Sequence, residues 1–226
     1  MTIFLIFTVG TVWGSFFGLV IDRFPNTSII RPRSHCGKCG QTLIWRDLMP
    51  IVSQFINHAR CRYCGVKLSY WYGLLEWLCG CLFVIGWLGK VDLTFCLICL
   101  ASFLMVGFDL KSHAFPLWVW LVFFLLLSFT SPYKPLIFLC LLMAILTELL
   151  AFMMGSGDWL YLSLIAFSTD FLQLSLCLFL ASLGGLLYYA LKIKQKKAEI
   201  PFLPFLFIGY LCSVYLITIF SMLIDL

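Results

Sequence analysis

Two aspartates border long apolar runs in this chain of 226 residues, and they are the first candidates for chemistry. Asp109 closes the run that begins at Leu93, and Asp158 ends the tetrapeptide Gly155-Ser156-Gly157-Asp158. A carboxylate at membrane depth costs about 3 kcal/mol or more, so an aspartate kept there is a functional candidate. Because only 11% of the residues are charged, the two aspartates together suggest acid/base chemistry inside a membrane.

Paired carboxylates have a specific chemistry. Two like charges about 3 Å apart do not both ionise readily, so the pair shares a proton. The ionised member then takes a proton from water while the protonated member donates to a peptide carbonyl, which hydrolyses an amide without a covalent intermediate. Serine or cysteine catalysis is less supported, because no His accompanies a membrane Ser or Cys at the right depth.

Each aspartate also has a purely structural interpretation. Asp109 could be a solvated carboxylate at a helix C-terminus, and Asp158 could be the N-cap of the following helix. Both structural interpretations together are less favoured, because both groups are expected at the same membrane face. Gly155 and Gly157 are expected to support the site by loosening the helix and letting the backbone approach a substrate strand.

A second candidate site consists of two C-x-x-C pairs in the polar part of the chain, each followed by a glycine that permits a tight turn. Four thiolates at this spacing suit tetrahedral Zn²⁺ in a closed structural site. Iron, or no metal, are the alternatives. His35 and His58 are expected to be neighbouring cations, because four cysteines complete the coordination. The predicted ligands are Cys36, Cys39, Cys61 and Cys64.

The elements that position these residues follow from composition. The chain is 63% hydrophobic with a mean hydropathy of +1.06, more apolar than a soluble domain of about 45–50%. This predicts an all-α polytopic membrane protein with about eight transmembrane helices, in contact with the lipid bilayer and not with nucleic acid. The expected apolar runs are Thr2–Ile21, Gly73–Gly89, Leu93–Phe108, Phe115–Thr130, Pro135–Met154, Trp159–Phe167, Phe171–Leu191 and Phe202–Leu223.

Lys and Arg set the expected topology. With the polar block 22–72, Lys111 and the cluster Lys192, Lys194, Lys196 and Lys197 inside, thirteen of the fifteen Lys and Arg are cytoplasmic. Both aspartates then lie on the cytoplasmic side, and both termini lie outside. The chain divides into a first transmembrane helix (1–21, without a cleavable signal), a cytoplasmic cysteine loop (22–72) and a membrane-embedded core with about seven helices (73–226).

The remaining acidic residues and cysteines receive structural interpretations. Glu76 is expected near the interface, and Glu148 is expected in an internal hydrogen-bonded structural role. Cysteines in apolar runs, such as Cys79 and Cys99, are expected to be small buried hydrophobic residues.

Five segments follow one another along the chain: 14–25, the cysteine loop with Trp45 to Pro50, Phe108-Asp109 with Pro116, Gly155 to Asp158, and Pro201 to Phe205. In this order they resemble the type IV prepilin leader peptidases, intramembrane aspartic proteases of the Gly-x-Gly-Asp kind. The resemblance covers nearly the whole chain, and the chain is most similar to short competence-type members of Gram-positive bacteria. The chain departs from the family pattern at Leu117, Leu160 and Trp71-Tyr72-Gly73, none of which is an aspartate or a cysteine.

The resemblance implies cleavage of prepilin-like precursors, including competence pseudopilins, at the cytoplasmic face of a bacterial plasma membrane. Asp109 and Asp158 would be the catalytic pair. Many members also N-methylate the new amino terminus with S-adenosylmethionine. Two other functions stay open from the sequence: a non-catalytic zinc-knuckle scaffold for pilus or secretion assembly, and a transporter that uses both aspartates as a proton relay.

Overall fold

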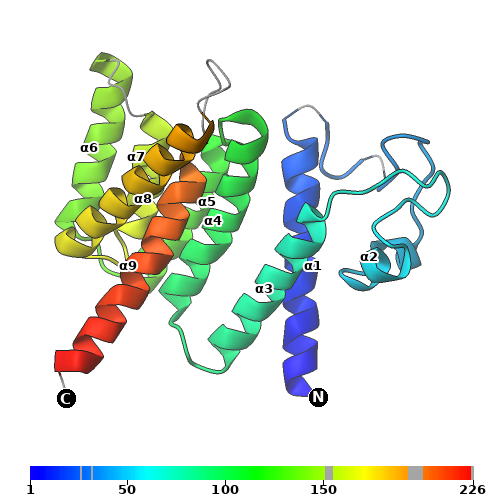
Figure 1. Cartoon of the computed structure of the whole chain (residues 1–226), viewed down its shortest axis with the longest axis horizontal. Helices are drawn as coiled ribbons and strands as arrows, with labels where there is room; N and C mark the ends of the chain where they lie inside the picture. Colours follow the sequence, from blue (N-terminus) through cyan, green and yellow to red (C-terminus); the bar gives the residue numbers. More distant parts are fainter. Residues whose placement is uncertain (26, 32, 151–154, 193–200, 225–226) are drawn as a thin grey trace. The chain divides into compact units, whose positions relative to one another are not determined.

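The computed structural model describes residues 1–25, 27–31, 33–150, 155–192 and 201–224, and the side chains of Lys192 and Ile224 are not described. The regular elements within these ranges are helices. They form two compact units, Met1–Asp92 and Leu93–Leu226, which we describe separately (Figure 1).

The first unit is built on two helices that pack along each other, α1 (Thr2–Arg23) and α3 (Trp71–Trp87) (Figure 1). Gly10 and Gly14 lie on one face of α1, because residues four apart share a face. A Cβ atom at Gly14 would lie 2.6 Å from Cα of Glu76 on α3. Small residues let helix backbones approach this closely in membranes. The glycine spacing of α1 therefore selects the face that meets α3.

The loop between these helices is tied to both of them. It contains the short helices η1 (Trp45–Leu48) and α2 (Val52–Ile56). The backbone N–H of Ile51 donates to Oε2 of Glu76 on α3 at 2.7 Å. The Tyr72 hydroxyl of α3 donates to Asp22 of α1. These bonds fix where the loop leaves the helices and where it returns.

The second unit is a bundle in which most of the packed helix pairs are neighbours in sequence, and the fourth helix with the ninth is the main sequence-distant pair. The fourth helix packs against the fifth and the ninth, the sixth against the seventh, and the eighth against the ninth. Its core includes Met105, Tyr161 and Tyr210, each 0% exposed. The helices are α4 (Leu93–Ser112), α5 (Leu117–Thr130), α6 (Pro135–Leu150), α7 (Ser156–Ile165), α8 (Phe171–Lys192) and α9 (Leu203–Ile224).

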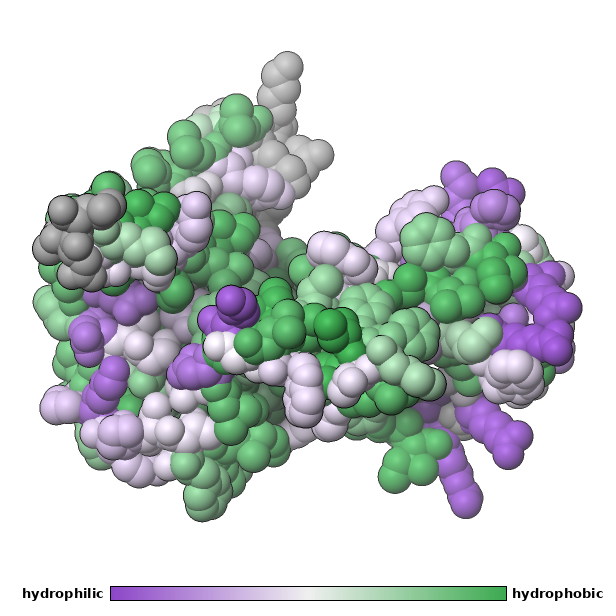
Figure 2. Space-filling model, turned by 90° about the horizontal axis from the view of Figure 1, so that it is seen from below, coloured by the Kyte–Doolittle hydropathy of each residue, from purple (hydrophilic) through white to green (hydrophobic). Residues whose placement is uncertain are grey.

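The helices confirm the predicted all-α polytopic class. Four described helices are long and apolar enough to span a membrane: Thr2–Arg23, Leu93–Ser112, Phe171–Leu191 and Leu203–Leu223. Three shorter apolar helices are Trp71–Trp87, Leu117–Thr130 and Pro135–Leu150. Hydrophobic side chains cover much of the surface seen in Figure 2, while hydrophilic ones gather over the cysteine loop at the right of the view. The eight-span count and the sidedness stay predictions.

The packing units group the helices differently from the three segments expected from sequence, and those segments stay predictions. Helix α3 belongs to the first unit, although the sequence placed residues 73–226 in one core. The reason is the glycine contact with α1, which hydropathy does not reveal. Of the basic cluster used for topology, Lys192 ends α8, and Lys194, Lys196 and Lys197 lie outside the described residues.

Candidate functional site

Asp109 lies in the last turn of α4 and is only 6% exposed. Its Oδ2 accepts a hydrogen bond of 3.1 Å from the backbone N–H of Leu203, the first residue of α9. His113 interacts electrostatically with the same carboxylate. The interpretation as a solvated helix end is therefore wrong. The carboxylate is buried and bonded to the N-terminus of another helix, where free N–H groups favour a negative charge.

Asp158 is the third residue of α7 and is half-buried. The N-cap of this helix is Gly155, so the interpretation of Asp158 as the N-cap is wrong. The backbone N–H of Gly155 interacts with the Asp158 carboxylate, and Asp109 acts on it electrostatically. The structure therefore brings the two predicted aspartates near each other at one end of the unit, from two separate helices.

The two glycines before Asp158 have different surroundings. Gly155 precedes α7 in an extended conformation, and a Cβ there would lie 3.6 Å from Oδ2 of Asp158. Gly157 is inside the helix, and a Cβ there would lie 3.1 Å from Cε1 of Phe115. Phe115 belongs to the connection between α4 and α5. The absence of a side chain at Gly157 lets this connection lie against α7, and a supporting role of the two glycines at the site stays a prediction.

A third carboxylate contacts the same segment. Glu148 accepts a hydrogen bond from the Ser156 hydroxyl, at the first residue of α7. Glu148 is exposed, so its expected hydrogen-bonded role is correct in kind but not internal. The bond links the end of α6 to the start of the helix that carries Asp158.

The two C-x-x-C pairs form the same backbone turn twice. The Cys36 N–H donates to Gln41 O, and the Gly40 N–H donates back to Cys36 O, both at 2.9 Å. In the second turn the Cys61 N–H donates to Val66 O, and the Gly65 N–H donates to Cys61 O. Gly40 and Gly65 have φ values of +69° and +68°, which favour glycine. Each glycine after a pair is therefore required by the turn, as the sequence predicted.

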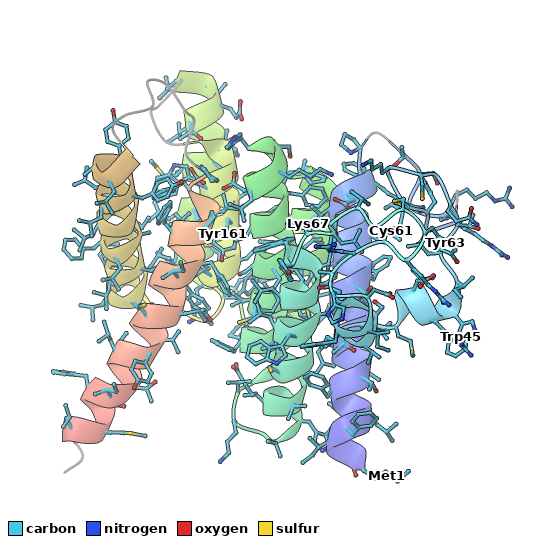
Figure 3. The ribbon with its side chains drawn as sticks, turned by 45° about the vertical axis from the view of Figure 1, so that its right-hand side comes forward. Met1, Trp45, Cys61, Tyr63, Lys67 and Tyr161 are labelled. Atoms are coloured by element: carbon cyan, nitrogen blue, oxygen red, sulfur yellow. The ribbon has the colours of Figure 1, made fainter. Side chains whose placement is uncertain are left out.

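These turns bring the four thiols together from both halves of the loop. All four Sγ atoms lie within 4.8 Å of one another, and Cys36 Sγ is 3.7 Å from Cys64 Sγ. Four sulfurs around a tetrahedral ion with bonds of about 2.3 Å would be about 3.8 Å apart. The geometry fits a metal ion. Cys61 lies in the loop with Tyr63 and Lys67 (Figure 3).

The thiols are not electrostatically equivalent. The backbone N–H groups of Cys39 and Lys38 lower the pKa of Cys36 to about 6. The Val66 N–H lowers the pKa of Cys64, but burial and the neighbouring thiols outweigh it and raise that pKa to about 11. Metal ligation requires thiolates. Cys36 therefore ionises more readily than Cys64, and a bound cation would favour ionisation of Cys64.

The other expectations for cysteine and histidine can be placed within the described residues. Among these residues the cluster with metal-ligand geometry consists of the four loop cysteines, without a histidine. His35 is instead hydrogen-bonded to Arg33 O through Nδ1. Cys79 and Cys99 are free and buried, as expected for small hydrophobic residues.

Sequence reasoning missed the groups that surround Asp109. It named Asp109 and the segment Pro201 to Phe205 but did not connect them, although the Leu203 N–H reaches the carboxylate. The available signal was a helix start at Leu203, after Pro201 and before Pro204. His113 was likewise not considered. Its place one turn after Asp109 on the same face was the usable signal.

Comparison with known proteins gives a consistent result. Residues 8–89 match the family model for the Bacterial Peptidase A24 N-terminal domain. A Myxococcus xanthus "Prepilin leader peptidase/N-methyltransferase" is 47% identical over 79 residues, 34% of this chain and 24% of that protein. An Escherichia coli "Type 4 prepilin-like proteins leader peptide-processing enzyme" is 26% identical over 255 residues, 93% of each chain.

A further relative extends the similarity beyond the first unit. The Neisseria gonorrhoeae "Prepilin leader peptidase/N-methyltransferase" is 30% identical over 193 residues, 74% of this chain and 65% of that protein. No solved structure gives a significant match to the chain. Three findings point to one family: the matched N-terminal model, the relatives that span most of the chain, and the helical fold with its four-cysteine cluster. The chain belongs to the type IV prepilin peptidase family.

Proposed function

We propose that this chain is an intramembrane aspartic endopeptidase that cleaves the leader peptide of type IV prepilin-like precursors, with Asp109 and Asp158 as the catalytic pair. The observation that carries the proposal is the proximity of these two carboxylates, which come from α4 and α7. Relatives named for prepilin processing support the choice of substrate.

The surroundings of the two carboxylates suggest a division of roles. The Leu203 N–H bonds Oδ2 of Asp109 at 3.1 Å, and such a bond favours the ionised form. Asp109 therefore suits the role of the general base, which takes a proton from the attacking water. Asp158, next to that charge, suits the acid that protonates the carbonyl oxygen, because adjacent like charges do not both ionise readily.

The reaction then balances without a covalent intermediate. The water oxygen bonds to the carbonyl carbon while Asp109 receives the water proton and Asp158 gives its proton to the carbonyl oxygen. In the second half, Asp109 passes its proton to the amide nitrogen as the C–N bond breaks. Asp158 recovers a proton from the hydroxyl of the tetrahedral carbon. The products are a carboxylic acid and an amine, and both aspartates return to their starting states.

The proposed cleavage point lies at the cytoplasmic membrane face, after a glycine that precedes a hydrophobic helix, as in the family. The proposed location is a bacterial plasma membrane, and the apolar helices support a location in a membrane. The cytoplasmic position of the cysteine loop and of both aspartates rests on the Lys and Arg distribution. Competence pseudopilins are the proposed substrates within the prepilin class.

The loop is proposed to hold structural zinc on Cys36, Cys39, Cys61 and Cys64. When bound, zinc would supply folding energy to the loop, which is too small to fold on a hydrophobic core. With four protein ligands the ion has no open position for a substrate. No chemical step is therefore assigned to it.

N-methylation is a second proposed activity, because several relatives carry the name peptidase/N-methyltransferase. S-adenosylmethionine would be the methyl donor. No group of described residues is identified as its site, so no step of methyl transfer is derived. Mass spectrometry of the processed N-terminus reports methylation and cleavage together.

The central test compares Asp109→Asn and Asp158→Asn with wild type, using co-expressed prepilin-like substrate and mass spectrometry of its N-terminus. Each variant is expected to lose at least about a hundredfold in cleavage rate, because each removes an acid/base group. Asp170→Asn is the control, since its side chain is 89% exposed and paired with Lys134. Retained cleavage in either test variant contradicts the catalytic pair.

The same variants separate the alternatives. A scaffold would support assembly without processing the substrate in wild type. A proton-relay transporter would show normal processing in both variants and loss of proton-coupled flux. Either pattern rejects the proteolytic function.

A further inference from the structure

A buried hydrogen bond connects the two helices that carry Asp109 and Asp158. Tyr161 of α7 and Ser102 of α4 are both 0% exposed, and their hydroxyl oxygens are 2.7 Å apart. The Ser102 hydroxyl donates its only proton to Ile98 O, also at 2.7 Å. Tyr161 is therefore the donor and Ser102 Oγ the acceptor. Tyr161 lies among the helices of the second unit (Figure 3).

The two residues of this bond lie on the same helix faces as the two aspartates. Ser102 precedes Asp109 by seven residues, or two helical turns, so both lie on nearly one face of α4. Tyr161 follows Asp158 by three residues, which places both on one side of α7. Because Ser102 meets Tyr161 and Asp109 lies near Asp158, the two helices run antiparallel at this point. Both aspartates therefore lie on the same side of this bond, toward the C-terminal end of α4 and the N-terminal end of α7.

Few other direct contacts set the spacing of these helices. Helix α4 packs mainly against α5 and α9, and α7 packs mainly against α6 and α5. The separation of α4 and α7 is therefore otherwise determined through intermediate helices. A direct hydrogen bond in the buried space between them defines one register, since a satisfied buried polar pair specifies a unique packing.

The hydroxyl is not required to fill space. Its surroundings include the buried residues Cys99, Cys177 and Tyr210, and a phenylalanine ring would occupy nearly the same volume. An unpaired buried hydroxyl would cost about 1–3 kcal/mol. The Tyr161 hydroxyl is nevertheless present and bonded to Ser102 on the other aspartate-bearing helix, which requires an explanation.

We propose that Tyr161 is a positioning residue that, through Ser102, sets the separation of the Asp109 and Asp158 carboxylates. The inference rests on the proposed proteolytic function and deepens it. Tyr161 does not touch the substrate. It holds α7 at the distance from α4 at which the two carboxylates share a proton.

The consequence for pH dependence follows from carboxylate coupling. The form with one proton on the pair is the active one, and stronger coupling widens the pH interval in which that form predominates. A larger separation weakens the coupling and moves both limbs of the pH–rate profile inward. His113 also faces Asp109, while Cys99, Cys177 and Tyr210 face Tyr161. Tyr161→Phe and Ser102→Ala retain all four of these residues. The control Tyr210→Phe changes only Tyr210 among them.

The test compares Tyr161→Phe with the control Tyr210→Phe in full-length protein. Both remove one fully buried hydroxyl, and the Tyr210 hydroxyl pairs with Ser168 Oγ at 2.9 Å, in the turn after α7. We expect Tyr161→Phe to lower kcat by about ten- to a hundredfold at nearly constant KM, because small misplacements of catalytic groups cost rates of this order. Its pH–rate profile should narrow. Tyr210→Phe should change neither by more than about twofold.

Two further measurements separate the inference from its premise. Ser102→Ala should reproduce the effect, and the double variant with Tyr161→Phe should show little additional loss. Asp109→Cys combined with Asp158→Cys permits oxidative cross-linking, detected as a linked peptide, without any activity. Adding Tyr161→Phe should slow this cross-linking, whereas adding Tyr210→Phe should not.

The outcomes are distinct. If wild type cleaves and the aspartate variants do not, the proposed function holds. An unchanged kcat, pH profile and cross-linking rate in Tyr161→Phe would then overturn the positioning role alone. If wild type does not cleave, the proposed function fails, and the cross-linking rates still decide whether Tyr161 sets the separation.

Discussion

The two units build their candidate sites in opposite ways. In Met1–Asp92 the four thiols come from two short, nearly identical turns within one loop. In Leu93–Leu226 the groups around Asp109 come from three helices, with Leu203 far along the chain. The first site depends on local backbone geometry, which places four thiols where they could hold a metal ion. The second depends on helix packing. Four predictions test this difference.

The largest effect is expected for the metal site. Cys61→Ser should abolish stoichiometric zinc binding, and binding of structural zinc contributes about 10–16 kcal/mol in small zinc-finger peptides. The loop should become sensitive to trypsin at Arg60 and Arg62, while the second unit stays protected. Metal analysis and limited proteolysis measure both results. Cys212→Ser, at an exposed cysteine on α9, should leave both unchanged. Unfolding that extends into the second unit would contradict the independence of the two sites.

The next effect concerns the Leu203 N–H. Leu203→Pro removes this donor to Asp109 at the first position of α9, where proline is compatible with a helix. Leu203→Ala removes a similar part of the side chain and keeps the donor. A hydrogen bond to a charged group contributes about 1.5–3 kcal/mol, so the proline variant should have a kcat about ten- to a hundredfold below the alanine variant. Equal rates would show that α9 does not act on Asp109.

A third prediction tests the packing of the first unit. A Cβ atom at Gly14 would meet backbone atoms of Leu75 and Glu76 at 2.6–2.8 Å. Because backbone cannot move aside as a flexible side chain can, Gly14→Ala should lower the free energy of unfolding by about 1–3 kcal/mol. Thermal unfolding in detergent measures this change. Gly37→Ala is the matched control, since nothing lies within 4 Å of its Cβ position. Equal stability of the two variants would reject the close approach of α1 and α3.

The smallest effect is expected at the anchor between the loop and α3. Glu76→Gln keeps an oxygen that accepts from the Ile51 N–H but removes the charge. Charged hydrogen bonds are about twice as strong as neutral ones, so we expect a loss of about 1 kcal/mol, confined to the loop. Hydrogen exchange at Ile51 measures it. Faster exchange throughout the second unit would show that the anchor is not local.

The helices were largely predictable, because the hydropathy of a local stretch of residues can be summed without knowing which other elements it contacts. The run Pro135–Met154 contains α6 (Pro135–Leu150), while its last four residues lie outside the described residues, and Phe202–Leu223 became α9 (Leu203–Ile224). The short run Trp159–Phe167 became α7, whose start at Ser156 includes Asp158 in its first turn. Helix boundaries were shifted by a few residues, because caps such as Gly155 are set by backbone geometry and not by hydropathy.

The partners of these helices were not predictable in the same way. The glycines of α1 show that a close contact exists but not that α3 makes it. The bond between Ser102 and Tyr161 joins two residues that are individually unremarkable in apolar helices. Such contacts depend on which helices are neighbours, and several arrangements of apolar helices bury similar surface.

The sequence by itself determined the candidate residues: two aspartates beside apolar runs, and four cysteines at metal-ligand spacing. It also determined the cysteine turns, because a glycine after each pair is a local requirement of the backbone. Only the tertiary structure decided that Asp109 is buried against the start of α9, that Asp158 lies inside the first turn of α7, and that Tyr161 links their helices. The physical reason is range: turn geometry and hydropathy act between near neighbours, whereas the spacing of two carboxylates depends on the packing of the whole helical unit.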